Sequence, residues 1–245
     1  MQSIDRAMGI VKLLVASSSD DGLSITELAN ECGLPVSSMH RILKAMAVHG
    51  MIQQDDKTKR YNLGNIWLEY GLHMYDTIDY VSTIRPELVR LAELTEESVY
   101  LSQPMGNEAL ITERIDNEKH AIRVFDKLGS RIPMNIGAAN KSMLAYMPNA
   151  EVKKVINQYV PKEEQPAFRE LLNQIHGQGY AISHSERTEG TSSVGAPILN
   201  HSGKVQGAVS VGVVSYNLTD ERLASLVRLV TETSRRISAK LGYRQ

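Results

Sequence analysis

The stretch from Ser24 to Gly50, SITELANECGLPVSSMHRILKAMAVHG, constrains the fold of this chain more than any other. Ser24 as an N-cap with Glu27 three residues later is the signature of a capping box, which predicts the start of a helix. Gly33 can adopt the left-handed conformation that ends a helix, and Pro35 is tolerated in the first turn of the next one. The sequence therefore predicts two short helices joined by a tight turn.

The second helix, expected from about 35 to 49, separates an apolar stripe from polar side chains. Val36, Met39, Leu43 and Met46 form the stripe that we expect to be buried. The other faces carry serines in the first turn, where the helix dipole favours phosphate, and basic side chains that can reach base edges or phosphates. On this reading, the residues predicted to contact DNA are Ser37, Ser38, His40, Arg41 and Lys44.

Two further elements complete the N-terminal unit. Ile4, Met8, Val11 and Val15 have helical spacing, so a helix with these residues buried is expected before the capping box. After Gly50, the runs MIQQ and RYNLG flank the polar turn DDKTK, a pattern typical of a two-stranded hairpin. Three helices followed by a hairpin make a winged helix-turn-helix, which we expect over residues 1–64.

The hairpin tip adds positive charge to the same unit. Lys57, Lys59 and Arg60 are predicted to lie against the DNA backbone, where the phosphate field attracts cations. The whole chain has a net charge of −1. Between 35 and 64, however, these three residues, Arg41 and Lys44 are opposed only by two aspartates, so the local excess is positive.

Residues 65–79, NIWLEYGLHMYDTID, predict a linker helix that is too apolar to stand alone. Trp67, Gly71, Met74 and Ile78 lie along one stripe. Such a stripe packs either on its own domain or on the same helix of a second subunit. We expect the second arrangement, a homodimer, because a protein that reads palindromic DNA must hold two recognition helices at a fixed spacing.

Residues 80–245 mix helical and strand-like segments. A helix is expected to begin at Pro86 or slightly earlier, and a terminal helix to run from about Thr219 to Leu241. Strand signals occupy 98–103, 108–115 and 121–125, followed by the loop GSRIPMNIGAAN, helical segments, and the strand signals YAISHS, TSSVGAPIL and GKVQGAVSVGVV. This order predicts an α+β sheet domain whose first and last helices cover one face.

Composition argues against several classes of protein. A single cysteine, Cys32, rules out an intramolecular disulfide and a Cys-rich metal site. The histidines lack metal-ligand spacing, and His184, Ser185 and Glu186 cannot form a triad if they lie in a strand, because adjacent side chains would point to opposite faces. No apolar run approaches the ~18 residues of a membrane span, and no signal peptide is evident. We expect a cytoplasmic protein without catalytic activity, metal or cofactor.

The motifs resemble those of one family. SIDRAMGIVKLL, then LSITELANECGLPVSSMHRILKAMAVHGMIQ, then RYNLG are similar to the DNA-binding half of the IclR family of bacterial transcription regulators. The resemblance continues through GSRIPMNIGAANKSMLAYMP and GYAISHSERTEGTSSVGAPILNHSGKVQGAVSVG, to about Leu241. It implies that the helix near Pro35 is the recognition helix and that residues 80–245 form a GAF-like domain that binds a small metabolite, often an organic acid. It also implies a dimer or dimer of dimers on palindromic promoter DNA.

Small residues in the C-terminal domain allow two readings. Residues 138 and 139 precede a helix, whose N–H groups attract anions, and GAVSVG leaves space within the sheet. Equally, such residues let elements pack closely. The resemblance implies an effector pocket lined by Val124, Ile132, Ala138, Ala139, Ser183, Ser193 and Ser210. Four positions in the matching segments depart from the pattern of the family. Ser183 stands where the family often has Asp, and Ser193 stands where Cys is common; Asn140 replaces the usual Gly, and Gly212 stands where Ser can occur. The ligand of better-known members is therefore not carried over.

Two functions follow from these patterns. The first is a ligand-responsive DNA-binding regulator, for which we expect repression over activation. The second is a metabolite-binding or protein-interaction module whose helix-turn-helix does not read DNA. Salt distinguishes them, because true DNA binding weakens steeply as salt is added.

Overall fold

The computed structural model describes residues 2–17, 22–76, 79–116, 124 and 126–244. These residues form two compact units, 1–79 and 80–245, which are described separately below. Among the described helices, none combines the length and apolar character that crossing a membrane requires.

The first unit is a winged helix-turn-helix. It contains α1 (Gln2–Ala16), α2 (Ile25–Glu31) and α3 (Val36–Val48), followed by β1 (Ile52–Gln54), β2 (Tyr61–Leu63) and α4 (Ile66–Asp76). The two strands pair antiparallel with Ile52 opposite Leu63 and Gln54 opposite Tyr61. The predicted helices and hairpin are therefore confirmed.

The turn between α2 and α3 forms as the sequence indicates. The Glu27 amide donates to Ser24 Oγ at 3.3 Å, and the Ser24 amide donates to Glu27 Oε2 at 2.7 Å. Gly33 has φ +63°, the left-handed conformation in which an L side chain would be strained. Pro35 is the N-cap of α3, so the helix begins one residue later than predicted.

The core of this unit confirms most of the predicted stripes and corrects two of them. Leu28, Met39 and Leu43 are buried at its centre. Val36, predicted to be buried, is 49% exposed, because it lies in the first turn of α3. On α1 the buried residues are Ile10, Val11 and Leu14, whereas Ile4, Met8 and Val15 are 71%, 38% and 65% exposed. Apolar residues lie on more than one face of α1, and only the face toward α2 and α3 is covered.

The helix α4 packs on its own unit through Trp67. The indole N–H of Trp67 donates to the Met51 carbonyl at 2.7 Å, and the ring lies against the core. Leu68, Tyr70 and Leu72 remain 65%, 57% and 58% exposed. The side chain of Met74 and residue Ile78, both part of the predicted stripe, lie outside the described residues.

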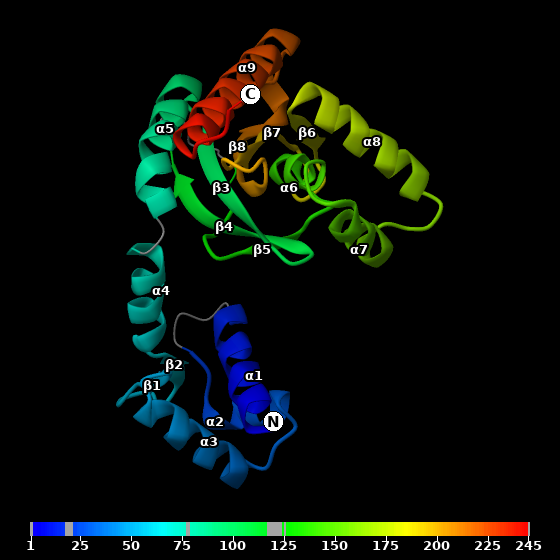
Figure 1. Ribbon diagram of the computed structural model, residues 1–245. Helices are drawn as coiled ribbons and strands as arrows, with labels where there is room; N and C mark the ends of the chain where they lie inside the picture. Colours follow the sequence, from blue (N-terminus) through cyan, green and yellow to red (C-terminus); the bar gives the residue numbers. More distant parts are fainter. Residues whose placement is uncertain (1, 18–21, 77–78, 117–123, 125, 245) are drawn as a thin grey trace. The chain divides into compact units, whose positions relative to one another are not determined.

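The second unit is an α+β domain built on one sheet (Figure 1). Among the described residues, six strands follow the order β5-β4-β3-β8-β7-β6, with every adjacent pair antiparallel. Their bounds are β3 (Ser98–Met105), β4 (Glu108–Ile115), β5 (Arg131–Pro133), β6 (Ala181–His184), β7 (Thr191–Leu199) and β8 (Val205–Val214). The predicted strand 121–125 lies almost entirely outside the described residues, and Val124 is not in a strand.

Helices cover both faces of this sheet (Figure 1). α5 (Asp79–Thr95) and α9 (Asp220–Lys240) pack on one face, as predicted, with Leu88, Leu101, Val211 and Val230 in the shared core. α6 (Ala138–Leu144), α7 (Asn149–Tyr159) and α8 (Gln165–Gln178) form a second core on the other face. A short 3-10 turn, Ser215–Asn217, precedes α9.

Two predictions about this domain are wrong. Pro86 lies inside α5 and does not begin it. A proline in a helix costs one backbone hydrogen bond, and the completely buried Ile84 and Leu88 on either side anchor the helix on the sheet despite this loss. Residues 131–133 form strand β5, although the sequence indicates a loop there, because Ile132 pairs with Ala109 of β4.

Candidate DNA-binding face and effector cavity

The exposed face of α3 carries the residues predicted to contact DNA. Ser37, His40, Arg41 and Lys44 are exposed, and Ser38 is half-buried. Positions 37, 40, 41 and 44 recur every three or four residues, so these side chains form one stripe opposite the buried Met39 and Leu43. Within the described part of the chain, neither Arg41 nor Lys44 has an ion-pair partner, so both charges are available to a ligand.

The tip of the hairpin is shaped by Asp55. Its carboxylate accepts hydrogen bonds from the Lys57 amide at 3.0 Å, the Thr58 amide at 2.7 Å and the Thr58 hydroxyl at 2.9 Å. The amide and hydroxyl of Thr58, followed by the amide of Lys57, lower the pKa of Asp55. Lys59 adopts φ +57°, and its side chain and that of Lys57 are exposed. The turn therefore presents two lysines on a backbone that Asp55 holds by hydrogen bonds.

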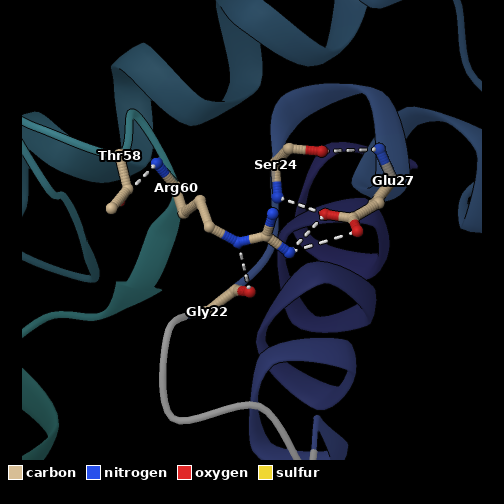
Figure 2. Close-up of polar contacts among 5 residues, drawn as sticks. All are labelled: Gly22, Ser24, Glu27, Thr58 and Arg60. Atoms are coloured by element: carbon tan, nitrogen blue, oxygen red, sulfur yellow. Dashed lines mark hydrogen bonds and ion pairs between the residues drawn. The ribbon is translucent and has the colours of Figure 1, made fainter.

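Arg60 differs from the two lysines, because its guanidinium is used within the domain. It donates to the Gly22 carbonyl at 2.9 Å and to both carboxylate oxygens of Glu27, at 2.8 and 3.1 Å (Figure 2). Glu27 in turn holds the amide of Ser24, and this hydrogen bond is the main reason that the pKa of Glu27 is lowered. Arg60 thus ties the hairpin to the first turn of α2.

In the C-terminal unit, a cavity of about 80 Å³ opens between the sheet and α6. It is lined by all seven residues of the predicted pocket: Val124, Ile132, Ala138, Ala139, Ser183, Ser193 and Ser210. The strand residues follow from the two-residue period of a sheet, because alternate side chains face the same side. Ser210 lies toward the cavity, whereas its neighbours Val209 and Val211 belong to the core under α5 and α9.

Close packing fixes the back of this cavity. A Cβ at Gly195 of β7 would lie 2.5 Å from the Ala139 amide nitrogen, so only glycine lets α6 approach the strand this closely. A Cβ at Gly212 would lie 3.1 Å from the Val124 side chain. Small residues here therefore let α6 pack closely on the sheet and leave the cavity open.

Tyr100 forms part of the polar wall. Its hydroxyl donates to the Val124 carbonyl at 2.6 Å and accepts from the Asp126 amide at 3.3 Å. Burial, as the largest effect, raises the pKa of Tyr100 above its usual value, so the hydroxyl stays protonated near neutral pH.

The loop between β6 and β7 lies at the cavity and carries two ion pairs. Glu186 Oε2 accepts from the Gly137 amide at 2.8 Å, and Oε1 pairs with the ammonium group of Lys141. Arg187 pairs with Asp126 at 3.0 Å. Glu186, Arg187 and Asp126 all line the cavity.

Sequence reasoning missed these charged residues. It placed 184–186 in a strand, but β6 ends at His184 and Ser185 has φ +52°, so the argument from opposite strand faces does not apply to Glu186. His184 Nδ1 is hydrogen-bonded to Ser192 Oγ at 2.9 Å, across the strand pair. The sequence signal that could have found the loop is the run Ser185–Gly190, which is polar and interrupts two strand patterns. Among the described residues, no cluster of His, Cys, Asp or Glu could hold a metal ion.

Comparisons with known proteins match the whole length of this architecture. Residues 3–56 match the IclR helix-turn-helix domain, and residues 72–239 match the model described as bacterial transcriptional regulator IclR C-terminal. The chain is 28% identical over 249 residues to the HTH-type transcriptional regulator KipR of Bacillus subtilis, covering 99% of this chain and 98% of that protein. It is 27% identical to the HTH-type transcriptional repressor AllR of Escherichia coli, covering 98% and 90%.

Solved structures agree with the fold. An IclR transcriptional regulator from Alicyclobacillus acidocaldarius matches with a TM-score of 0.83 at 22% identity, covering 99% of each chain. IclR of Thermotoga maritima matches with a TM-score of 0.78 at 26% identity, covering 99% and 100%. An IclR homologue from Microbacterium hydrocarbonoxydans, complexed with 4-hydroxybenzoate, matches with a TM-score of 0.83 at 18% identity, covering 98% of each chain. With its winged helix-turn-helix, its curled sheet domain and family matches over both, this chain belongs to the IclR family of bacterial transcriptional regulators.

Proposed function

We propose that this regulator binds operator DNA through the exposed stripe of α3 and the tip of the hairpin. The observation that carries the proposal is the pair of uncommitted cations, Arg41 and Lys44, on the exposed face of the helix-turn-helix. The proposed contacts are Ser37, Ser38, His40, Arg41, Lys44, Lys57 and Lys59. Arg41 suits bidentate pairing with guanine and the lysines suit phosphates. Arg60 is reassigned to holding the hairpin on α2, because its Nε and Nη2 donate to Gly22 and Glu27 there.

The regulator acts on a palindromic operator as a homodimer or a dimer of dimers. The exposed Leu68, Tyr70 and Leu72 of α4 support this, since an apolar surface of this kind is stabilised when it is covered. Two copies of α3 at a fixed spacing would read two half-sites. We place the protein in the cytoplasm, where it reaches chromosomal DNA, and we assign it no catalytic step.

The cavity of the C-terminal domain binds the effector, for which we propose a small organic acid. The relative complexed with 4-hydroxybenzoate supports a carboxylic acid as the ligand class. Binding would change operator affinity about 5- to 150-fold, corresponding to a coupling of about 1 to 3 kcal/mol. We expect the protein to act as a repressor.

Salt-dependent binding to the DNA upstream of its own gene tests the DNA-binding proposal. If Lys44, Lys57 and Lys59 each neutralise one phosphate in both subunits of a dimer, log K should fall against log salt with a slope of about −5. Lys44→Ala should make this slope shallower by about 2 units. Arg41→Ala should cost about 1 to 3 kcal/mol per half-site and relax the preference for one base.

Lys153→Ala is the matched control, because Lys153 is an exposed lysine of α7 outside the helix-turn-helix. It should leave both affinity and slope unchanged. If the wild-type protein prefers its upstream DNA no more than random duplex, with or without small acids, the regulator reading of these residues is refuted, and an interaction module becomes the better description.

A further inference from the structure

Lys141 and Glu186 form a pair that the proposed function does not yet use. The Lys141 side chain is only 4% exposed, whereas that of Glu186 is 30% exposed. Besides pairing with the ammonium group, Glu186 accepts the Gly137 amide at 2.8 Å. A buried cation on α6 therefore receives its counter-charge from a loop in which every residue from 185 to 190 is exposed.

This arrangement is asymmetric. Lys141 lies in a helix whose side chains are all buried, so an unpaired charge there is strongly unfavourable. Glu186 can return to water by a movement of its own loop, where hydration replaces what the carboxylate loses. Another carboxylate could therefore replace Glu186 without leaving Lys141 unpaired. A neutral molecule of the same shape could not.

The pair is also placed where a ligand would meet it. Glu186 and Gly137 line the effector cavity, next to the Arg187–Asp126 ion pair and the hydroxyl of Tyr100. Asp126 and Glu186 are the acidic groups and Arg187 the basic group of the lining, and Lys141 pairs with Glu186 from outside that lining. Because Arg187 already has Asp126 as its partner, Lys141 is the cation that loses its partner if Glu186 leaves.

We infer that Glu186 is a resident carboxylate that occupies the position of the effector's acid group and is exchanged for it when the effector binds. This inference rests on the proposed recognition of a small organic acid. Glu186 sets the affinity for carboxylates by competing with them. Exchange detaches Glu186 from α6 while Arg187 stays paired with Asp126, and thereby links occupancy of the cavity to the conformation of its rim.

Acetate and its neutral isostere acetamide test this competition in the full chain, by isothermal titration at constant ionic strength. Glu186→Gln removes the competing charge but keeps the shape, so it should bind acetate at least tenfold more tightly than the wild type, with acetamide unaffected. Glu189→Gln is the matched control: Glu189 lies in the same loop, is exposed, and has no ion pair among the described residues. It should bind acetate as the wild type does.

A second measurement uses the unaltered protein, in case Glu186→Gln folds poorly. In the wild type, saturating acetate should speed amide hydrogen exchange in 185–190, because the loop loses its attachment to α6. Equal acetate affinity in Glu186→Gln and wild type, slower exchange in the loop, or an absence of acetate binding to both proteins would each overturn the inference. None of these three results refutes the proposal that the protein is a DNA-binding regulator, provided that the wild type still binds its upstream DNA and releases it in response to another acid. Failure of DNA binding refutes that proposal separately.

Discussion

Replacing Gly195 by alanine isolates one physical effect, the close approach of α6 to β7. The added Cβ would lie 2.5 Å from the Ala139 nitrogen and 2.8 Å from the Ala138 carbonyl carbon. Ordinary van der Waals contact begins at 3.4 Å, so the first turn of α6 must move by roughly 1 Å. Both atoms belong to the backbone, so no side-chain rotation relieves the contact. Gly195 does not have a positive φ, so alanine causes no backbone strain of its own.

Overpacking of this kind typically costs about 1 to 3 kcal/mol, and contact with a rigid backbone places Gly195→Ala near 3 kcal/mol. For a domain of this size, that corresponds to a fall in melting temperature of about 6 to 12 °C. Far-UV circular dichroism follows the unfolding of both units. The single tryptophan, Trp67, reports on residues 1–79, so its fluorescence transition serves as an internal reference. Because Ala138 and Ala139 also line the cavity, the response to small acids should weaken.

Gly177→Ala is the matched control. Gly177 lies in α8, and a Cβ there would meet nothing within 4 Å. Alanine should therefore stabilise the domain by up to about 1 kcal/mol, as expected inside a helix. If Gly195→Ala were as stable as the wild type, or if both substitutions had the same effect, close contact between α6 and β7 would not be what requires glycine at 195.

Three further predictions concern the pocket, the hairpin and pH. Ser210→Leu, which fills the cavity, should abolish the response of DNA binding to small acids while leaving basal DNA binding intact; equal loss of both would show that Ser210 is simply a core position. Arg60→Ala should lower the urea midpoint measured by Trp67 fluorescence, because the hairpin loses its hydrogen bonds to Gly22 and Glu27, whereas Lys57→Ala should weaken DNA binding without moving that midpoint. Burial tends to raise the pKa of Glu87, but hydrogen bonds and charges from Lys240 and Arg236 outweigh burial and lower the pKa below its ordinary 4.5. The contribution of these two cations to stability is therefore present above about pH 4.5 and is lost as the pH falls through the folded pKa of Glu87. The difference in urea midpoint between wild type and Glu87→Gln should accordingly shrink in acid. A difference constant with pH would contradict this assignment.

The elements that sequence predicts well are those set by neighbouring residues. The Ser24–Glu27 capping box, Gly33 and Pro35 act within a few positions. The capping box and Gly33 appear where expected, and the helix begins one residue after Pro35. In the sheet, the alternation around Ser210 assigns each side chain to a face once the strand is recognised. The strand β5 escaped recognition, because its three residues carry too short a pattern and depend on pairing with β4.

What the sequence by itself determined is the order of the helices and of the longer strands, the winged helix-turn-helix and the small residues of a cavity, because capping, helical period and strand alternation are local. The tertiary structure decided which charges are free and which are engaged. Arg60 is 33 positions from Glu27, and Lys141 is 45 positions from Glu186. Arg60 and Lys57 look alike in the chain, but only folding brings a carboxylate to one of them. Pairing over such distances depends on how elements pack, and no local pattern encodes it.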